Sequence, residues 1–173
     1  MKKILLLFTL LITVSMYVSA KNFYYKGISL EYKKGKLTGS GDESKSINVT
    51  GTIGITSFCI SAEKLKYDES DTDAVTTYLD EVRTNIENME GFLRIERTND
   101  IKDGTLNGIE GQQFDIIYRK KNMRLGQRVF CYIQDGWRVN ITYTCIGKVV
   151  NEKEFASIFK TFNFTPEESG SIY

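Results

Sequence analysis

The side chains available for chemistry are limited first by an absence, because the 173-residue chain contains no histidine. Ser-His-Asp and Cys-His catalytic arrangements are therefore excluded, as are zinc sites that depend on imidazole ligands. A cysteine nucleophile would instead need a nearby lysine or arginine to lower its pKa. Among Cys59, Cys131 and Cys145, the second comes nearest to such a group, Arg138 on the following strand. Packed, unreactive thiols are the alternative interpretation, and a disulfide that uses Cys59 remains open.

Carboxylates gather just before a helical pattern, at Asp68, Glu69, Asp71 and Asp73. Oxygen ligands bunched on a loop can hold Ca²⁺, so Asp68, Asp71 and Asp73 are candidate cation contacts. The regular calcium-binding loop, with its central glycine and distal glutamate, is missing. Acids at the start of a helix also interact favourably with the helix dipole, which explains the same residues without a metal.

A hydrolase without histidine would need two acids across a cleft, roughly 5 to 10 Å apart in glycosidases. Glu110 and Asp115 share one predicted strand but point to opposite faces, because side chains alternate along a strand. A hydrolase is therefore kept only as an alternative. We predict no catalytic residues, no resident metal and no cofactor.

Five basic residues surround one predicted β-turn: Arg119, Lys120, Lys121, Arg124 and Arg128. Positive charge at this density could contact an anionic lipid headgroup, a glycan or an acidic partner. Of the five, we predict that Arg119, Lys120, Lys121 and Arg124 bind a partner. A solvated turn that protects the sheet edge from pairing is the alternative explanation.

The elements that position these side chains centre on residues 124–145, which we predict to form two strands joined at Asp135-Gly136. Asp-Gly between alternating apolar residues is a strong hairpin signal, because both turn residues must tolerate positive φ. Cys131 and Cys145 then point to opposite faces, which disfavours a disulfide between them. In this register the facing pairs are Phe130 with Ile141, Tyr132 with Val139, and Gln134 with Trp137.

The remaining patterns predict an α+β domain with a central antiparallel sheet of about six strands and two helices packed on it. The long helix is predicted over residues 71–90, where apolar residues recur at helical spacing, and a C-terminal helix begins after Asn151. Gly- and Ser-rich residues 35–46 predict a mobile loop, and residues 100–108 a turn-rich loop. Besides the hairpin, strands are predicted over residues 24–32, 49–60, 92–98 and 109–120.

The N-terminus predicts a secretory signal peptide over residues 1–20, with Lys2 and Lys3 before an apolar run and cleavage after Ala20. The apolar run is too short to span a membrane, so the mature chain is not expected to span one. A single domain is predicted over residues 21–165, followed by a tail over residues 166–173. The whole chain has 23 basic and 22 acidic residues, so removing Lys2 and Lys3 changes the net charge from +1 to −1. Nucleic acid is not an expected partner at that balance.

Motifs spread along the mature chain resemble the PsbP-like superfamily, which includes the DcrB-like bacterial envelope proteins and shares its fold with a Ran-binding import factor. The resemblance implies a central antiparallel sheet with helices packed on it, in a protein that acts mainly through binding. The chain departs from the commoner pattern after Tyr32, where Lys33-Lys34-Gly35 replaces an expected Pro and Trp. The motifs are Gly27 to Tyr32, Tyr78-Leu79, Leu106 to Gly108 before a strand ending at Tyr118, Trp137 to Thr142, and Phe155 through Phe164.

These observations favour a secreted, periplasmic, non-catalytic binding or accessory protein with a protein partner in the cell envelope. A carrier of a small ligand or divalent cation, using the acidic segment before the long helix, is the second hypothesis. A histidine-free hydrolase is the third.

Overall fold

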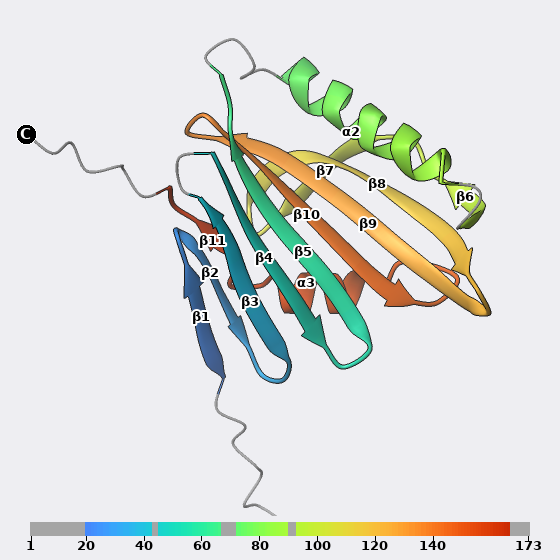
Figure 1. Cartoon of the computed structure of the whole chain (residues 1–173), viewed down its shortest axis with the longest axis horizontal. Helices are drawn as coiled ribbons and strands as arrows, with labels where there is room; N and C mark the ends of the chain where they lie inside the picture. Colours follow the sequence, from blue (N-terminus) through green and yellow to red (C-terminus); the bar gives the residue numbers. More distant parts are fainter. Residues whose placement is uncertain (1–19, 43–44, 67–71, 90–92, 167–173) are drawn as a thin grey trace, which may run out of the picture.

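The computed structural model describes residues 20–42, 45–66, 72–89 and 93–166. Within these ranges the chain forms an antiparallel α+β fold, as predicted, but with eleven strands and two helices (Figure 1). None of the described helices is long and apolar enough to cross a membrane. The strands are β1 Lys21–Tyr25, β2 Ile28–Tyr32, β3 Lys36–Asp42, β4 Ser46–Ile53, β5 Thr56–Lys64, β6 Arg94–Thr98, β7 Lys102–Leu106, β8 Ile109–Lys120, β9 Met123–Gln134, β10 Trp137–Ile146 and β11 Asn163–Phe164, and the helices are α2 Thr72–Glu87 and α3 Glu152–Ile158.

The strands form two sheets, so the predicted single sheet of about six strands is wrong. The larger sheet has eight strands in the order β3-β4-β5-β10-β9-β8-β6, with β7 also paired to β8. The smaller sheet has three strands in the order β1-β2-β11. The two segments read as single strands over residues 24–32 and 49–60 are in fact hairpins. Each hairpin turns in two residues, at Lys26-Gly27 with φ of 48° and 83°, and at Gly54, whose φ is 63°.

The predicted mobile loop over residues 35–46 is also wrong, because most of it forms β3 along the edge of the larger sheet. Here glycine provides close contact rather than freedom. A Cβ atom on Gly39 would lie 2.3 Å from Cγ of Tyr25, so only glycine leaves room for that ring. Tyr25 belongs to β1, and its ring therefore packs the smaller sheet onto the larger one. Similarly, the predicted loop over residues 100–108 contains β7, which pairs with β8 through a turn at Asn107-Gly108.

The predicted hairpin of β9 and β10 is confirmed, residue for residue. Phe130 pairs with Ile141, Tyr132 with Val139, and Gln134 with Trp137. Asp135 and Gly136 both have positive φ, 52° and 75°, as the two-residue turn requires. The range predicted for the next strand towards the N-terminus, residues 109–120, is that of β8.

Two hydrophobic clusters lie on opposite faces of the larger sheet. One face is covered by α3 and the smaller sheet, where Phe159 and Phe164 are fully buried against residues such as Ile60 and Ile141. The other face is covered by α2, but only over β8 and β9, where Leu79 packs with Phe114 and Cys131. Figure 1 shows α2 lying along the β8 and β9 half of the sheet, while β3, β4 and β5 have no helix over them on that side.

The long helix is shorter than predicted: α2 ends at Glu87, and Asn88 and Met89 form a turn after it. The second helix begins as predicted, because the Asn151 side chain accepts a hydrogen bond from the backbone N–H of Glu154. Tyr143 donates a 2.7 Å hydrogen bond to the Glu154 carboxylate, which links α3 to β10.

Candidate functional site

The predicted basic turn is divided by the structure into two paired arginines and two free-standing lysines. Nε of Arg119 and Nε of Arg124 each lie 2.6 Å from one carboxylate oxygen of Glu96 on β6. This ion-paired fork fixes both guanidinium groups along the sheet and neutralises part of their charge. Lys120 and Lys121 are exposed and form no ion pair within the described ranges, so they carry the turn's available positive charge.

Glu96 should titrate below the ordinary glutamate value of about 4.3. Hydrogen bonds from Arg124 and then from Arg119 favour its charged form and lower its pKa. The stabilisation that Glu96 contributes is therefore complete above about pH 4.3 and is lost as the pH falls through the lowered pKa. An NMR titration of the glutamate carboxyl groups measures this. Arg124→Met should raise the Glu96 pKa more than Arg119→Met does.

The matched control for this titration is Arg83→Met. Arg83 pairs with Asp80 at 2.6 Å on α2, away from the turn. Removing it should leave the Glu96 pKa unchanged, and a Glu96 pKa at the ordinary value in the unmodified chain would contradict the fork.

Arg128 does not belong to the basic turn, because it is buried, with 5 % of its surface exposed. It donates two hydrogen bonds, of 2.7 and 2.9 Å, to Asp115 on the neighbouring strand and one of 3.0 Å to Glu152 on α3. The hydrogen bond to Asp115 is the main cause that raises the pKa of Arg128. Asp115 is thus a structural partner of Arg128 and not half of an acid pair with Glu110.

The predicted cation site falls mainly outside the described residues, which exclude Asp68, Glu69 and Asp71. Asp73 lies in the first turn of α2 and is exposed. Across the described ranges no three Cys, Asp or Glu side chains come together in a way that could hold a metal ion. The cation hypothesis therefore stays a prediction with no geometry to support it.

The three cysteines are all free thiols. Cys131 and Cys145 point into the two opposite hydrophobic clusters, as the hairpin register predicts. Burial raises the pKa of Cys131 to about 12, and Arg138 lowers it only slightly. Burial also raises the pKa of Cys59. None of these thiols has the lowered pKa that a cysteine nucleophile needs.

The largest unoccupied surface with a regular arrangement of side chains is the half of the larger sheet that α2 leaves uncovered. On this side, alternate residues of four adjacent strands are short and polar, apart from one thiol. Register places them in cross-strand rows, for example Thr38, Thr50, Cys59 and Thr142. We call this surface the open polar face: Thr38, Ser40, Asn48, Thr50, Thr52, Ser57, Cys59, Ser61, Asn140, Thr142 and Thr144.

Charged groups border the open polar face at the end nearest α2. Arg138 lies 2.6 Å from the Glu63 carboxylate, and its guanidinium stacks on the ring of Tyr78, 3.9 Å from the ring centre. This contact joins α2 to β10 and β5. Next to it, Oδ1 of Asn140 is buried and has no hydrogen-bond partner within the described structure. An unsatisfied buried acceptor is uncommon in folded proteins, so this end of the face offers a position for a donor from outside the chain.

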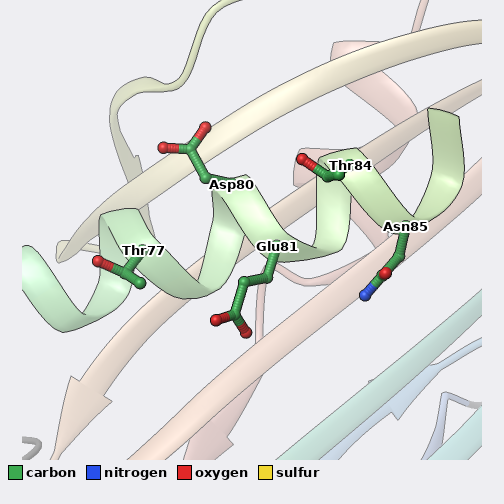
Figure 2. A pocket seen from close by; sticks show the side chains of 5 residues that line it. All are labelled: Thr77, Asp80, Glu81, Thr84 and Asn85. Atoms are coloured by element: carbon green, nitrogen blue, oxygen red, sulfur yellow. The ribbon is translucent and has the colours of Figure 1, made fainter. Parts of the chain in front are cut away.

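A shallow hollow of about 460 Å³ lies on α2, lined by Thr77, Asp80, Glu81, Thr84 and Asn85. Figure 2 shows that all five side chains come from this one helix. They occupy positions away from Val75 and Leu79, which pack on the sheet. Because one helix supplies every contact, the hollow cannot enclose a ligand, and we do not assign a site there.

Comparison with known proteins places this architecture in a structural class. No protein-family model and no curated protein sequence matches the chain. The solution structure of cyanobacterial PsbP (CyanoP) from Synechocystis sp. PCC 6803 superimposes with a TM-score of 0.56 and 11% identity, over 87% of this chain and 95% of that one. A crystal structure from Bacteroides thetaiotaomicron VPI-5482 has a TM-score of 0.55 and 15% identity, over 85% of this chain. This chain covers 49% of that protein's length.

The fold is therefore that of an antiparallel α+β protein with helices on both faces of the sheet. Within that class it is PsbP-like, as the sequence motifs indicated. At 11% and 15% identity these similarities establish the fold alone. The narrower resemblance to DcrB-like proteins stays a prediction.

Proposed function

We propose that the chain is a secreted, non-catalytic accessory protein of the cell envelope and that it binds a protein partner through the open polar face. The observation that supports this most directly is the face itself, an uncovered sheet surface with aligned side chains. The apolar run that follows Lys2 and Lys3 supports secretion. The PsbP-like fold is compatible with a binding role but does not specify one.

The chemistry of the open polar face suits a polar partner of low charge. Hydroxyl and amide groups each donate and accept hydrogen bonds, so a row of them can follow the groups of another protein surface or hold bridging water. Short side chains such as Thr50 and Ser57 also lose little rotamer freedom when they are buried. Neighbouring strands lie about 4.8 Å apart, which gives the rows a regular spacing.

Other surfaces fit a protein partner less well. The two arginines of the basic turn, Arg119 and Arg124, are already bound to Glu96. The hollow on α2 is lined by one helix. The open polar face, by contrast, has exposed members on β3, β4 and β5 and an unsatisfied acceptor, Asn140, on β10.

A pull-down of the tagged chain from solubilised cell envelope tests the proposal. We expect a protein that co-purifies in fixed ratio with the unmodified chain, and we expect Thr50→Arg with Ser57→Arg to reduce its recovery by at least about tenfold. An unpaired charge placed inside a polar interface carries a large desolvation cost. Both residues are exposed, so neither substitution should disturb the core.

The matched control is Thr105→Arg, which places the same side chain at an exposed threonine on β7, outside the face. This variant should retain the partner. The proposal fails if the control loses as much partner as the double variant, or if no protein is enriched over an unrelated tagged chain.

A further inference from the structure

One edge of the larger sheet carries an excess of unpaired positive charge. The described chain begins at this edge, and the β2–β3, β4–β5, β8–β9 and β10–α3 connections all lie there (Figure 1). The acids Glu96 and Glu152 near it are paired with arginines. We call it the lysine edge, after seven exposed lysines with no ion pair in the described structure: Lys21, Lys33, Lys34, Lys36, Lys120, Lys121 and Lys148.

The same edge exposes aliphatic side chains at its loop tips. Ile55 in the β4–β5 turn is 76% exposed, and Val149 before α3 is 60% exposed. Ile146 at the end of β10 and Met123 at the start of β9 are 51% and 50% exposed. These are four of the six large apolar side chains that are exposed in the described structure. Isolated exposed apolar residues are ordinary, but several at one edge between lysines mark an interaction surface.

A hollow of about 630 Å³ opens at the lysine edge, between the end of β2 and α3. Lys33, Lys34 and Lys160 line it with ammonium groups, while Ile53, Ile158 and Tyr32 supply apolar surface. Ala20 also lines it, so the apolar N-terminal segment joins the domain at this hollow. Its walls thus combine cations with an aliphatic floor, the pattern that suits a phosphate group attached to a hydrocarbon chain.

The opposite edge of the sheet lacks this pattern. Asp42, Glu63 and Asp135 lie there together with Lys45 and Lys64, so both signs of charge are present. None of the six exposed apolar side chains belongs to the turns of that edge. The lysine edge is therefore distinguished by charge and by apolar exposure together.

We propose that the lysine edge docks on the surface of an anionic lipid membrane. Ile55 and Val149 enter the boundary between headgroups and acyl chains, the lysines contact lipid phosphates, and the hollow beside Lys33 receives one headgroup. Lysines near an anionic surface each strengthen binding, and inserted aliphatic side chains add to it. The sheet then stands upright on the membrane, because its strands run from this edge to the opposite one. The open polar face stays accessible from the side in that orientation.

Vesicle sedimentation of the whole chain tests the proposal. The lipids are phosphatidylcholine alone, or phosphatidylcholine with one third phosphatidylglycerol. We expect binding to be stronger on the anionic vesicles and to fall when salt screens the charges. Lys33→Glu with Lys34→Glu should lower the partition onto anionic vesicles by about tenfold or more, given about fivefold for each surface lysine lost. Ile55→Ser should weaken it with the net charge unchanged.

The matched control is Lys45→Glu with Lys64→Glu, which makes the same charge change at the opposite edge and should leave vesicle binding close to that of the unmodified chain. The apolar N-terminal segment is present in every variant, so the differences report on the lysine edge. Equal binding to neutral and anionic vesicles, or equal losses in the two double variants, would overturn the proposal. Complete competition by millimolar glycerol 3-phosphate would also overturn it, since the edge would then bind a free anion. These outcomes are independent of the pull-down, because the variants leave the open polar face intact.

Discussion

Replacing Arg128 by leucine should lower the free energy of unfolding by about 3 to 5 kcal/mol. The guanidinium group is 5% exposed and makes a two-pronged contact with Asp115, whose side chain is 12% exposed. Without Arg128 the Asp115 carboxylate stays buried beside β9 with no cation, and an uncompensated buried charge is costly. Urea denaturation followed by far-UV circular dichroism measures the loss as a lower midpoint with an unchanged slope.

Two further variants separate the buried pair from the rest of the network. Glu152→Gln removes the third member, but the Glu152 side chain is 73% exposed, so the loss should stay within about 1 kcal/mol. Arg128→Leu combined with Asp115→Leu removes both buried charges and should recover much of the stability lost in the single variant. If the double variant were as unstable as the sum of the two single ones, packing by Arg128, including its position 5.4 Å over the Phe155 ring, would be the main cause instead.

The parts of the fold that the sequence predicted well depend on local rules. Asp135-Gly136 sets the turn and therefore the register of β9 and β10, and side-chain alternation then assigns each residue to a face. Asn151 likewise marks the start of α3, because its side chain satisfies a backbone N–H that the first helical turn leaves free. In both cases a few adjacent residues contain the whole instruction.

The missed hairpins did leave a signal, namely a shift in the phase of the apolar alternation. Buried residues fall at odd positions in β4, as in Ile47 and Val49, and at even positions in β5, as in Phe58 and Ile60. A two-residue turn reverses the parity of the residues that share a face, so the shift locates the turn between them. Reading one continuous strand placed Cys59 and Ile55 together, whereas Cys59 belongs to the open polar face and Ile55 to an exposed turn.

The candidate surfaces could not be predicted because they depend on the order of strands in the sheet. The polar residues of β4 and β5 alternate visibly in the sequence, but only the pairing of β5 with β10 brings Thr142 beside Cys59. The basic turn was recognised as a cluster, yet the ion pairs with Glu96 on β6 and the burial of Arg128 under α3 are contacts between distant segments. Clusters of charge in a sequence therefore predict a surface only after their partners have been placed.

Replacing Phe159 by alanine should lower the free energy of unfolding by about 3 to 5 kcal/mol, because it leaves a cavity between α3 and the larger sheet. Phe159 is fully buried. Its ring centre lies 5.0 Å from that of Phe155 and 5.2 Å from that of Phe58, the latter in an edge-on arrangement. The ring therefore joins α3 to β5 in the middle of the cluster that also contains the smaller sheet. Urea denaturation measures the loss.

The graded variant Phe159→Leu tests the cavity explanation, since leucine refills part of the space and should cost clearly less than alanine. Lys160→Ala, at the next and exposed position, should change stability by no more than about 0.5 kcal/mol. Equal losses for leucine and alanine would show that the aromatic contacts with Phe58 and Phe155, and not the filled volume, hold α3 in place. A loss below about 1 kcal/mol for Phe159→Ala would mean that the sheet and α3 close over the space. In that case α3 would contribute little to the fold, and the hollow beside Lys160 would lack the rigid wall that a lipid headgroup site needs.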